Sequence, residues 1–213
     1  MNEFLTSFTP LCRTKKGREA IKNYGLKPYI DGSCRREPDF ENVYPAITGL
    51  CRPGFVKRLS SKDLVIYITN KKEIGSHNLV AILQVIEIVD SHTEAEKWYK
   101  NMNVPMPNNI MVKGNKPMPL DMTHQKTKCV KCVNGAKTIE EWDAEYVKRA
   151  QDSPKVAICK IWENYLFLDQ PPEITKEDFL KVFKRIPGTQ TPPKLKENEP
   201  DRFLELLKTK RGK

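Results

Sequence analysis

The stretch Asp63-Leu-Val-Ile-Tyr-Ile-Thr69 and the run Leu79-Val-Ala-Ile-Leu-Gln-Val-Ile-Glu-Ile-Val89 decide the fold. The first stretch is short, β-branched and aromatic, which is typical of a buried strand. The second run is long enough to bend across a small barrel. Residues 75–78, Gly-Ser-His-Asn, form a turn-like link between them. The two runs are therefore expected to pair as a β-hairpin.

Capping signals place helices around these runs, because a Ser or Thr followed three residues later by an acid satisfies the first free amides of a helix. Two more apolar runs, Val156–Trp162 and Tyr165–Leu168, are separated by Glu163-Asn164 and predict a second hairpin. The predicted helix starts are Thr93-Glu-Ala-Glu96, Thr138-Ile-Glu-Glu141, Thr175-Lys-Glu-Asp178 and Glu199-Pro-Asp201.

Strands from both ends of the chain, interleaved with helices, predict an α+β fold around a small mixed or antiparallel sheet. The sheet is expected to be either a closed barrel or strongly curved, with peripheral helices. Residues 1–170 are assigned to one domain, and residues 171–213 to a helical C-terminal extension. An inserted excursion, rich in proline and containing cysteines, is placed at about 104–137. Its first part, 104–127, shows little periodicity and is expected to contribute poorly to the core.

The chain is basic, with 37 Lys plus Arg against 27 Asp plus Glu among its 213 residues. Residues 1–62 hold 12 basic and 6 acidic side chains, so the positive field is expected to be asymmetric. Nucleic acid is the commonest partner of such a basic face, although a solvated surface is the alternative. No apolar run is long enough to cross a bilayer, and the first residues do not resemble a signal peptide, so a cytoplasmic location without membrane contact is expected. Six cysteines are accordingly interpreted as reduced thiols or metal ligands.

The segment Tyr29-Ile-Asp-Gly-Ser-Cys-Arg-Arg-Glu-Pro-Asp-Phe-Glu41 is too rich in polar groups for a plain strand. Together with Ile47-Thr-Gly-Leu-Cys-Arg52 and the strand carrying Tyr67 and Thr69, it resembles nucleotide-modification-associated domains with a PUA-like fold. The resemblance covers roughly residues 3–100, with the hairpin at 156–168 completing the barrel. It implies a small β-barrel related to the EVE, ASCH and YTH group, whose members bind RNA or modified bases in an aromatic-lined pocket. The excursion and the Pro-rich tail are additions that would cover this pocket or bind a protein partner.

A protein that recognises a base needs a flat aromatic face, fixed polar groups for the base edge, and cations for the flanking phosphates. The alternatives are aromatic rings buried in the core and arginines in a structural ion network. The predicted base-binding residues are Tyr29, Asp31, Ser33, Tyr44, Tyr67, Thr69 and Trp98, and the predicted phosphate-binding residues are Arg35, Arg36, Arg52, Lys57 and Arg58.

Cys129-Val-Lys-Cys132, with His124 upstream, has the spacing of a metal knuckle and predicts a Zn²⁺ site. Tetrahedral zinc needs a fourth ligand, for which Cys159 or His92 are candidates. The alternative is a pair of free cysteines in a lysine-rich loop.

The leading hypothesis is a module that binds nucleic acid or a nucleotide by recognising a base, with a modified base favoured. Sequence signatures of hydrolases, zinc proteases and nucleotide-binding loops are absent, which favours a protein that is not an enzyme. The acid cluster between Asp31 and Glu41 supports one rival, a metal-dependent enzyme of base modification or nucleic-acid cleavage. Arg35 and Arg36 lie in the same cluster and would neutralise its carboxylates. A protein-interaction subunit is the third hypothesis.

Overall fold

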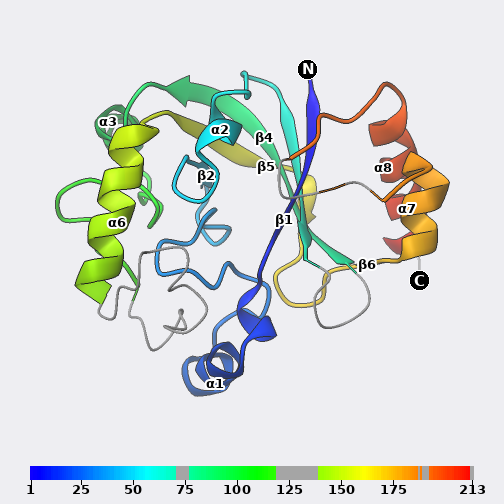
Figure 1. The fold of residues 1–213 in the computed structure, drawn as a ribbon, viewed down its shortest axis with the longest axis horizontal. Helices are drawn as coiled ribbons and strands as arrows, with labels where there is room; N and C mark the ends of the chain where they lie inside the picture. The colour runs from blue at the N-terminus through cyan, green and yellow to red at the C-terminus, as the bar shows by residue number, and fades with distance from the viewer. Residues whose placement is uncertain (71–76, 119–138, 187, 189–191, 212–213) are drawn as a thin grey trace.

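The computed structural model describes residues 1–70, 77–118, 139–186, 188 and 192–211, which form a curved sheet with helices around it (Figure 1). The elements in chain order are β1 (Glu3–Phe8), the 3-10 helix η1 (Leu11–Arg13), α1 (Lys15–Tyr24), β2 (Ala46–Ile47), α2 (Pro53–Val56), β3 (Leu64–Thr69), β4 (His77–Val89), α3 (His92–Asn101), α6 (Ile139–Asp152), β5 (Val156–Leu166), β6 (Glu173–Ile174), α7 (Lys176–Phe183) and α8 (Glu199–Arg211).

The sheet is mixed and is built around β4, its longest strand. The strand order is β1-β3-β4-β5-β2, and β6 also pairs with β4. Strands β1 and β3 are parallel, whereas the other neighbours are antiparallel. The register of β4 against β5 shifts between Ala81 and Leu83 and again between Val85 and Glu87. Because such irregularities bend a strand, the sheet is strongly curved. The predicted α+β class and the β3–β4 hairpin are confirmed.

The second predicted hairpin is wrong. Strand β5 runs without interruption from Val156 to Leu166 and pairs with β4 over most of that length. Glu163 and Asn164 have positive φ angles of 44° and 62°, so these two residues form a bulge where a turn was expected. Because β4 is long enough to pair with the residues on both sides of this bulge, both halves of β5 stay in one strand.

Both faces of the sheet are buried, which explains why β3 is apolar at every position from Leu64 to Ile68. Val65 and Tyr67 pack into one inner cluster that all five strands of the main path share with residues of the segment 29–59. Leu64, Ile66 and Ile68 face the other way, into a second cluster with α7 and α8. A third, separate cluster lies under α3.

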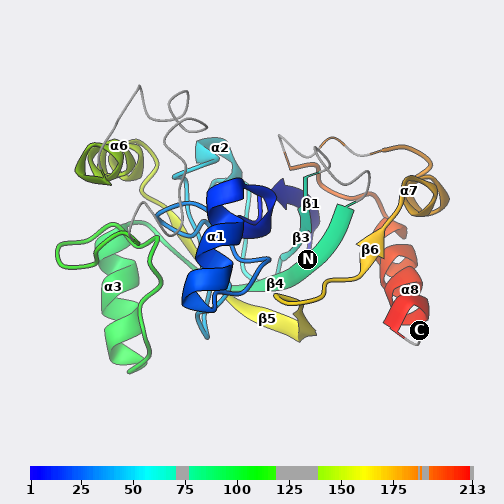
Figure 2. The ribbon, with the colours of Figure 1, turned by 90° about the horizontal axis from the view of Figure 1, so that it is seen from below.

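Helices α7 and α8 lie at one end of the sheet, and α3 and α6 lie at the other (Figures 1 and 2). The capping box at Thr175 is confirmed, because Thr175 and Asp178 exchange side-chain-to-backbone bonds. Phe179 and Phe203 of the segment after residue 170 are buried in the same cluster as the sheet. Helices α7 and α8 therefore pack on the face of the sheet that carries Leu64, Ile66 and Ile68. No helix in the described ranges combines the length and apolar character that a bilayer crossing requires.

The predicted start of α3 is wrong by two residues. Ser91 is the N-cap and accepts a hydrogen bond from the Glu94 amide, while the Glu94 carboxylate accepts one from the Asp90 amide. Ser91-His-Thr-Glu94 matches the same capping pattern as the predicted Thr93 box. The predicted cap at Thr138 lies outside the described residues, and α6 ends at Asp152, before Pro154.

The described part of the excursion, residues 104–118, is a loop without helix or strand, as expected. It is nevertheless part of the core, contrary to expectation: Ile110 and Asn109 are fully buried, and Ile110 packs in the cluster under α3. The loop can bury these residues because groups from other parts of the fold form hydrogen bonds with its backbone.

Arg35 supplies several of these hydrogen bonds. Its side chain is 2% exposed, and Nη1 donates to the carbonyls of Asn108 (2.9 Å) and Asn115 (3.0 Å). Nε and Nη2 donate to the Asp143 carboxylate on α6, at 2.8 Å for Nε. One guanidinium therefore joins three segments that are distant in sequence.

Replacing Asp143 with Asn should lower the free energy of unfolding by about 2–4 kcal/mol, because it leaves the buried Arg35 cation without its counter-charge. Urea denaturation measures this change. Asp169→Asn is the matched control, since its ion pair with Lys27 is exposed on both sides and should change stability by about 0–1 kcal/mol. Equal, small losses in both variants would contradict the structural role of Arg35.

Candidate ligand-binding site

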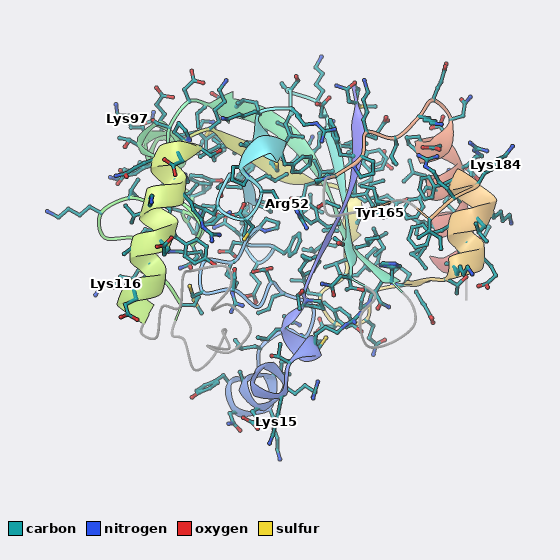
Figure 3. All side chains as sticks on the ribbon, viewed as in Figure 1. Lys15, Arg52, Lys97, Lys116, Tyr165 and Lys184 are labelled. Carbon is teal, nitrogen blue, oxygen red and sulfur yellow. The ribbon has the colours of Figure 1, made fainter. Side chains whose placement is uncertain are left out.

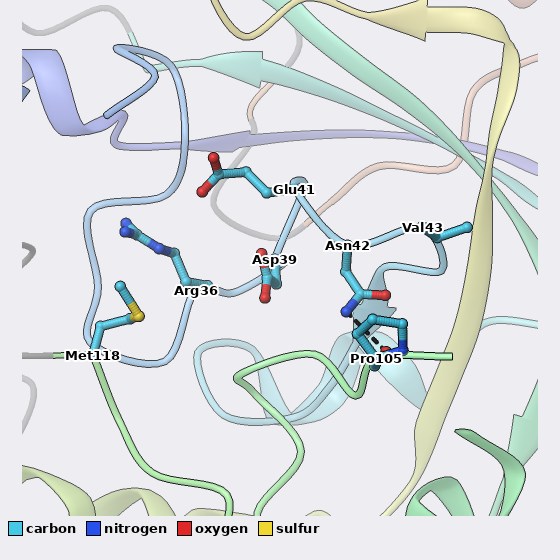
Figure 4. A pocket seen from close by; sticks show the side chains of 7 residues that line it. All are labelled: Arg36, Asp39, Glu41, Asn42, Val43, Pro105 and Met118. Atoms are coloured by element: carbon cyan, nitrogen blue, oxygen red, sulfur yellow. Dashed lines mark hydrogen bonds between the residues drawn. The ribbon is translucent and has the colours of Figure 1, made fainter. Parts of the chain in front are cut away.

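A hollow of about 220 Å³ lies where the loop after Asp31 meets the excursion. We call it the Arg36 hollow. Figure 4 shows Arg36 and Met118 at one end, Asn42, Val43 and Pro105 at the other, and the carboxylates of Asp39 and Glu41 between them. The Asn42 side chain donates to the Pro105 carbonyl (3.0 Å), and the Met118 amide donates to the Cys34 carbonyl (2.8 Å). These two bonds hold the walls of the hollow together.

Arg36 is buried, with 2% of its surface exposed, and its backbone has a positive φ of 48°. Nη1 donates to the Asp31 carbonyl, whereas Nη2 has no hydrogen-bond partner. Burial lowers the pKa of Arg36, and the carboxylates of Asp31, Glu41 and Asp39 act against that shift. This nitrogen is enclosed by protein, and an unpartnered buried donor is costly, so Nη2 lowers the stability of the loop.

Asp31 shapes the loop that carries Arg36. Its carboxylate accepts bonds from the Ser33 amide (2.9 Å), the Ser33 hydroxyl and the Glu37 amide (3.2 Å). Burial raises the pKa of Asp31, and these hydrogen bonds oppose the rise. The side chains of Asp31 and Ser33 therefore hold the turn between them, as is usual for an Asx turn.

Glu37 lies between the loop and β2. Its carboxylate accepts bonds from the Thr48 amide (2.8 Å), the Thr48 hydroxyl (2.7 Å) and the Asn109 side chain (3.0 Å). Burial raises the pKa of Glu37 to about 7. This carboxyl group therefore exchanges its proton near neutral pH, which is unusual for a glutamate.

Cys51 and Arg52 follow at the end of the same polar segment. Arg52 lies near the centre of the molecule, whereas Lys97, Lys116 and Lys184 lie at its periphery (Figure 3). The Arg52 guanidinium donates to the Thr6 hydroxyl (2.6 Å) and to the Ser7 carbonyl of β1. Cys51 is exposed, yet the surrounding protein raises the pKa of its thiol, as at the bottom of a concave surface.

The structure does not bring the predicted aromatic residues together. Tyr67 is 2% exposed and packs edge-on against Phe40 and Phe8, with ring centroids 5.2 and 6.4 Å away. Tyr29 is half-buried against the same inner cluster. Tyr44 and Trp98 form a separate edge-to-face pair at 5.3 Å beside α3. The four rings thus divide between two clusters, Tyr29 and Tyr67 in one and Tyr44 and Trp98 in the other.

Thr69 and Arg13 form a buried contact that sequence reasoning missed. Thr69 is fully buried and accepts bonds from the Asn78 amide (2.9 Å) and from Arg13 Nη2 at 3.4 Å. Arg13 is 5% exposed, and its Nε and Nη1 have no partner. Arg13 lies in no motif of the sequence, so no local signal identifies it as a site residue.

The five predicted phosphate-binding residues differ in whether their cationic groups are free to contact a ligand. Arg35 uses all three guanidinium nitrogens on internal acceptors, so it acts as a structural clamp. Lys57 and Arg58 are exposed just after α2. Arg58 also donates to the Pro192 carbonyl (2.9 Å) and lies over the Phe4 ring.

The predicted zinc ligands Cys129, Cys132 and His124 lie outside the described residues. Of the suggested fourth ligands, Cys159 is fully buried in the inner cluster, and His92 Nδ1 accepts a bond from the Met111 amide (3.1 Å). Within the ranges that the structure describes, no three His, Cys, Asp or Glu side chains lie close enough to hold a metal ion. Three of the four acids of the rival enzyme hypothesis are instead engaged in hydrogen bonds. Asp31 and Glu37 accept the bonds described above, and Asp39 accepts one from the Asn108 amide (3.1 Å).

Comparison with known proteins adds little. No family model matches the chain, and no curated protein matches it. Among solved structures it is similar to ASCH from Zymomonas mobilis, with 9% identity and a TM-score of 0.39 over 96% of this chain and 94% of that chain. Two single-residue variants of that protein give 9% and 8% identity with TM-scores of 0.38 and 0.39. Likeness at this level does not define a family.

The raised pKa of Glu37 makes a prediction for stability against pH. Between about pH 4.5 and 7 the folded protein keeps the Glu37 proton that the unfolded chain has lost, so stability should fall as pH rises through this window. The loss is roughly 3–4 kcal/mol, at about 1.4 kcal/mol for each pH unit between the two pKa values.

Denaturant unfolding of wild type and Glu37→Gln across this range measures the effect, because glutamine cannot ionise. The difference between the two profiles should decline with pH. Burial lowers the pKa of His92 to about 4, which gives both proteins an opposite slope that cancels in the difference. Parallel profiles would show that Glu37 keeps an ordinary pKa.

Proposed function

We propose that this chain is a binding module that recognises nucleic acid or a nucleotide by taking a base into the Arg36 hollow. The observation that carries the proposal is the lining of the hollow, in which the charged residues Arg36, Asp39 and Glu41 stand beside the apolar residues Val43, Pro105 and Met118. Such a combination of apolar surface with a few polar groups is typical of a small-ligand site.

The lining of the hollow suits a flat heterocycle. Val43, Pro105 and Met118 supply apolar surface for the faces of a ring, and Arg36, Asp39 and Glu41 supply donors and acceptors for its edge. A volume of about 220 Å³ is below the roughly 300–1,000 Å³ of sites for drug-sized ligands, which favours one base over a whole dinucleotide.

Cations around the hollow would hold the phosphates. The chain carries a net charge of +10, and Lys57, Arg58 and Arg52 remain candidates for phosphate contact. Tyr44 and Trp98 are half-buried and offer a second surface on which a neighbouring base can stack.

Asp31 and Ser33 are assigned a positioning role in this proposal, since their side chains hold the loop that presents Arg36. Tyr67 and Thr69 are assigned a supporting role in the core beneath that loop, because both are buried. Preference for a modified base, which the family resemblance implies, remains part of the proposal.

Affinity for a single-stranded oligonucleotide should fall steeply between about 50 and 200 mM salt, with a log–log slope of about −0.7 for each phosphate contact. Fluorescence anisotropy measures it. Lys57→Ala combined with Arg58→Ala should weaken binding to all sequences alike and reduce the slope by about 1–1.5.

Lys208→Ala is the control, because this exposed lysine lies on α8, on the opposite face of the sheet from α2. Binding that does not depend on salt would overturn the proposal that these residues contact the phosphate backbone of the nucleic acid. A lack of binding to every oligonucleotide and nucleotide, modified ones included, would favour a protein-interaction subunit, and turnover of a bound nucleotide would favour the enzyme.

A further inference from the structure

We propose that one exposed face of helix α1 binds the phosphate backbone of the nucleic acid. Lys15, Arg18 and Lys22 line this surface, which we call the α1 face. The inference rests on the proposed function and adds a surface for the backbone to the hollow that takes the base.

The helix aligns the three cations. Positions i, i+3 and i+7 lie on one side of an α-helix, so Lys15, Arg18 and Lys22 form a single row. The row is about 10 Å long, at about 1.5 Å for each residue. Successive phosphates of one strand lie about 3.4 Å apart along a duplex, so the row is long enough to contact at least two of them.

The chain on either side of α1 anchors the helix to the rest of the protein. The Leu11 amide donates to the Ile30 carbonyl (2.9 Å), and Pro10 pairs with Asp31 in an antiparallel bridge. Gly17 is buried against the Leu11 carbonyl, where a side chain would clash. Helix α1 lies at the lower edge of the molecule in Figure 1, outside the sheet. It is therefore fixed at its base, next to the loop that carries the hollow, and open on its outer side.

The cations of the α1 face are available to a ligand. All three side chains are exposed, and Arg18 donates one hydrogen bond, to the Cys12 carbonyl (3.1 Å). In the part of the chain that the structure describes, none of the three forms an ion pair. A phosphate bound here would displace no internal partner of these charges.

The chemistry of the α1 face favours a phosphate backbone over a protein partner. The residues next to the row on the same side of the helix are Glu19 and Asn23, so the surface is polar throughout. The centre of a protein–protein interface is apolar, and this face offers no such centre. Contacts to phosphate need only cations and hydrogen-bond donors, and they are independent of base sequence.

Fluorescence anisotropy of the full chain with a single-stranded oligonucleotide tests the inference. Combining Lys15→Gln, Arg18→Gln and Lys22→Gln should reduce the log–log salt slope by about 1.4–2, the value for two to three phosphate contacts. At about 100 mM salt, this change corresponds to an affinity on the order of 25- to 100-fold lower. Affinity for a mononucleotide, which has a base but no strand, should stay nearly unchanged.

The matched control combines Lys176→Gln, Lys181→Gln and Lys184→Gln. It removes the same three charges from exposed positions on α7 and at its C-cap. Lys15 and Lys184 lie on different sides of the molecule (Figure 3). Because both triple variants have the same net charge, only a local contact can make their affinities differ. Thermal unfolding checks that both variants fold, as expected for exposed side chains.

Glu19→Gln should change the affinity in the opposite direction. Glu19 is the one acid in the α1 sequence, and it is exposed beside the cation row. Removing its repulsion of phosphate should strengthen oligonucleotide binding about 2- to 3-fold. A folding defect would not strengthen binding. Glu205→Gln, at an exposed position on α8, is the control and should leave the affinity unchanged.

Equal affinities of the two triple variants would overturn the α1 face, and so would unchanged or weaker binding in Glu19→Gln. Base binding in the hollow would stand in either case if mononucleotides still bind. Oligonucleotide binding that depends on α1, without binding of any mononucleotide, would support the α1 face and overturn base recognition in the hollow. Failure of the unaltered chain to bind any nucleotide or oligonucleotide would overturn both.

Discussion

The site depends on one buried interaction, the contact of the Arg35 guanidinium with Asp143 and with two carbonyls of the excursion. Residues 104–118 have no helix or strand to fix them, yet they supply Pro105 and Met118 to the Arg36 hollow. A loop keeps a single conformation only when its backbone groups find partners. Arg35 provides them and also connects the loop to α6. The shape of the hollow is therefore determined by a residue that does not line it.

Buried carboxylates have a similar supporting role in this protein. Asp31 and Glu37 accept three hydrogen bonds each from neighbouring donors, and both have raised pKa values because of burial. Acids that fold a loop in this way are poor ligands for a divalent cation, which prefers carboxylates free to coordinate. The same network leaves Arg36 with one unpartnered nitrogen. The polar density that suggests a catalytic cluster in the sequence thus has mainly a structural origin.

Sequence reasoning succeeded where the signal lay in neighbouring residues. It failed where a strand distant in the sequence determined the structure. The β3–β4 hairpin and the Thr175 capping box follow from apolar runs and short spacing, and both are confirmed. Glu163-Asn164 resembles a turn, but the long strand β4 pairs with the residues on both sides of it. Helix α1 had been overlooked, although Thr14 caps it and Gly25 ends it in a left-handed conformation, signals that were present in the chain.

The sequence by itself determined that the chain is basic, that residues 63–69 form a buried strand, and that the segment from Asp31 to Glu41 is unusual. It could not distinguish the adjacent residues Arg35 and Arg36, which have the same chemistry and the same immediate neighbours. Only the tertiary structure separates them, because the partners of Arg35 come from positions 108, 115 and 143. Arg36 has a positive φ, bonds the Asp31 carbonyl within its own loop, and lines the hollow. The physical reason is that the availability of a charged group depends on what the fold places beside it.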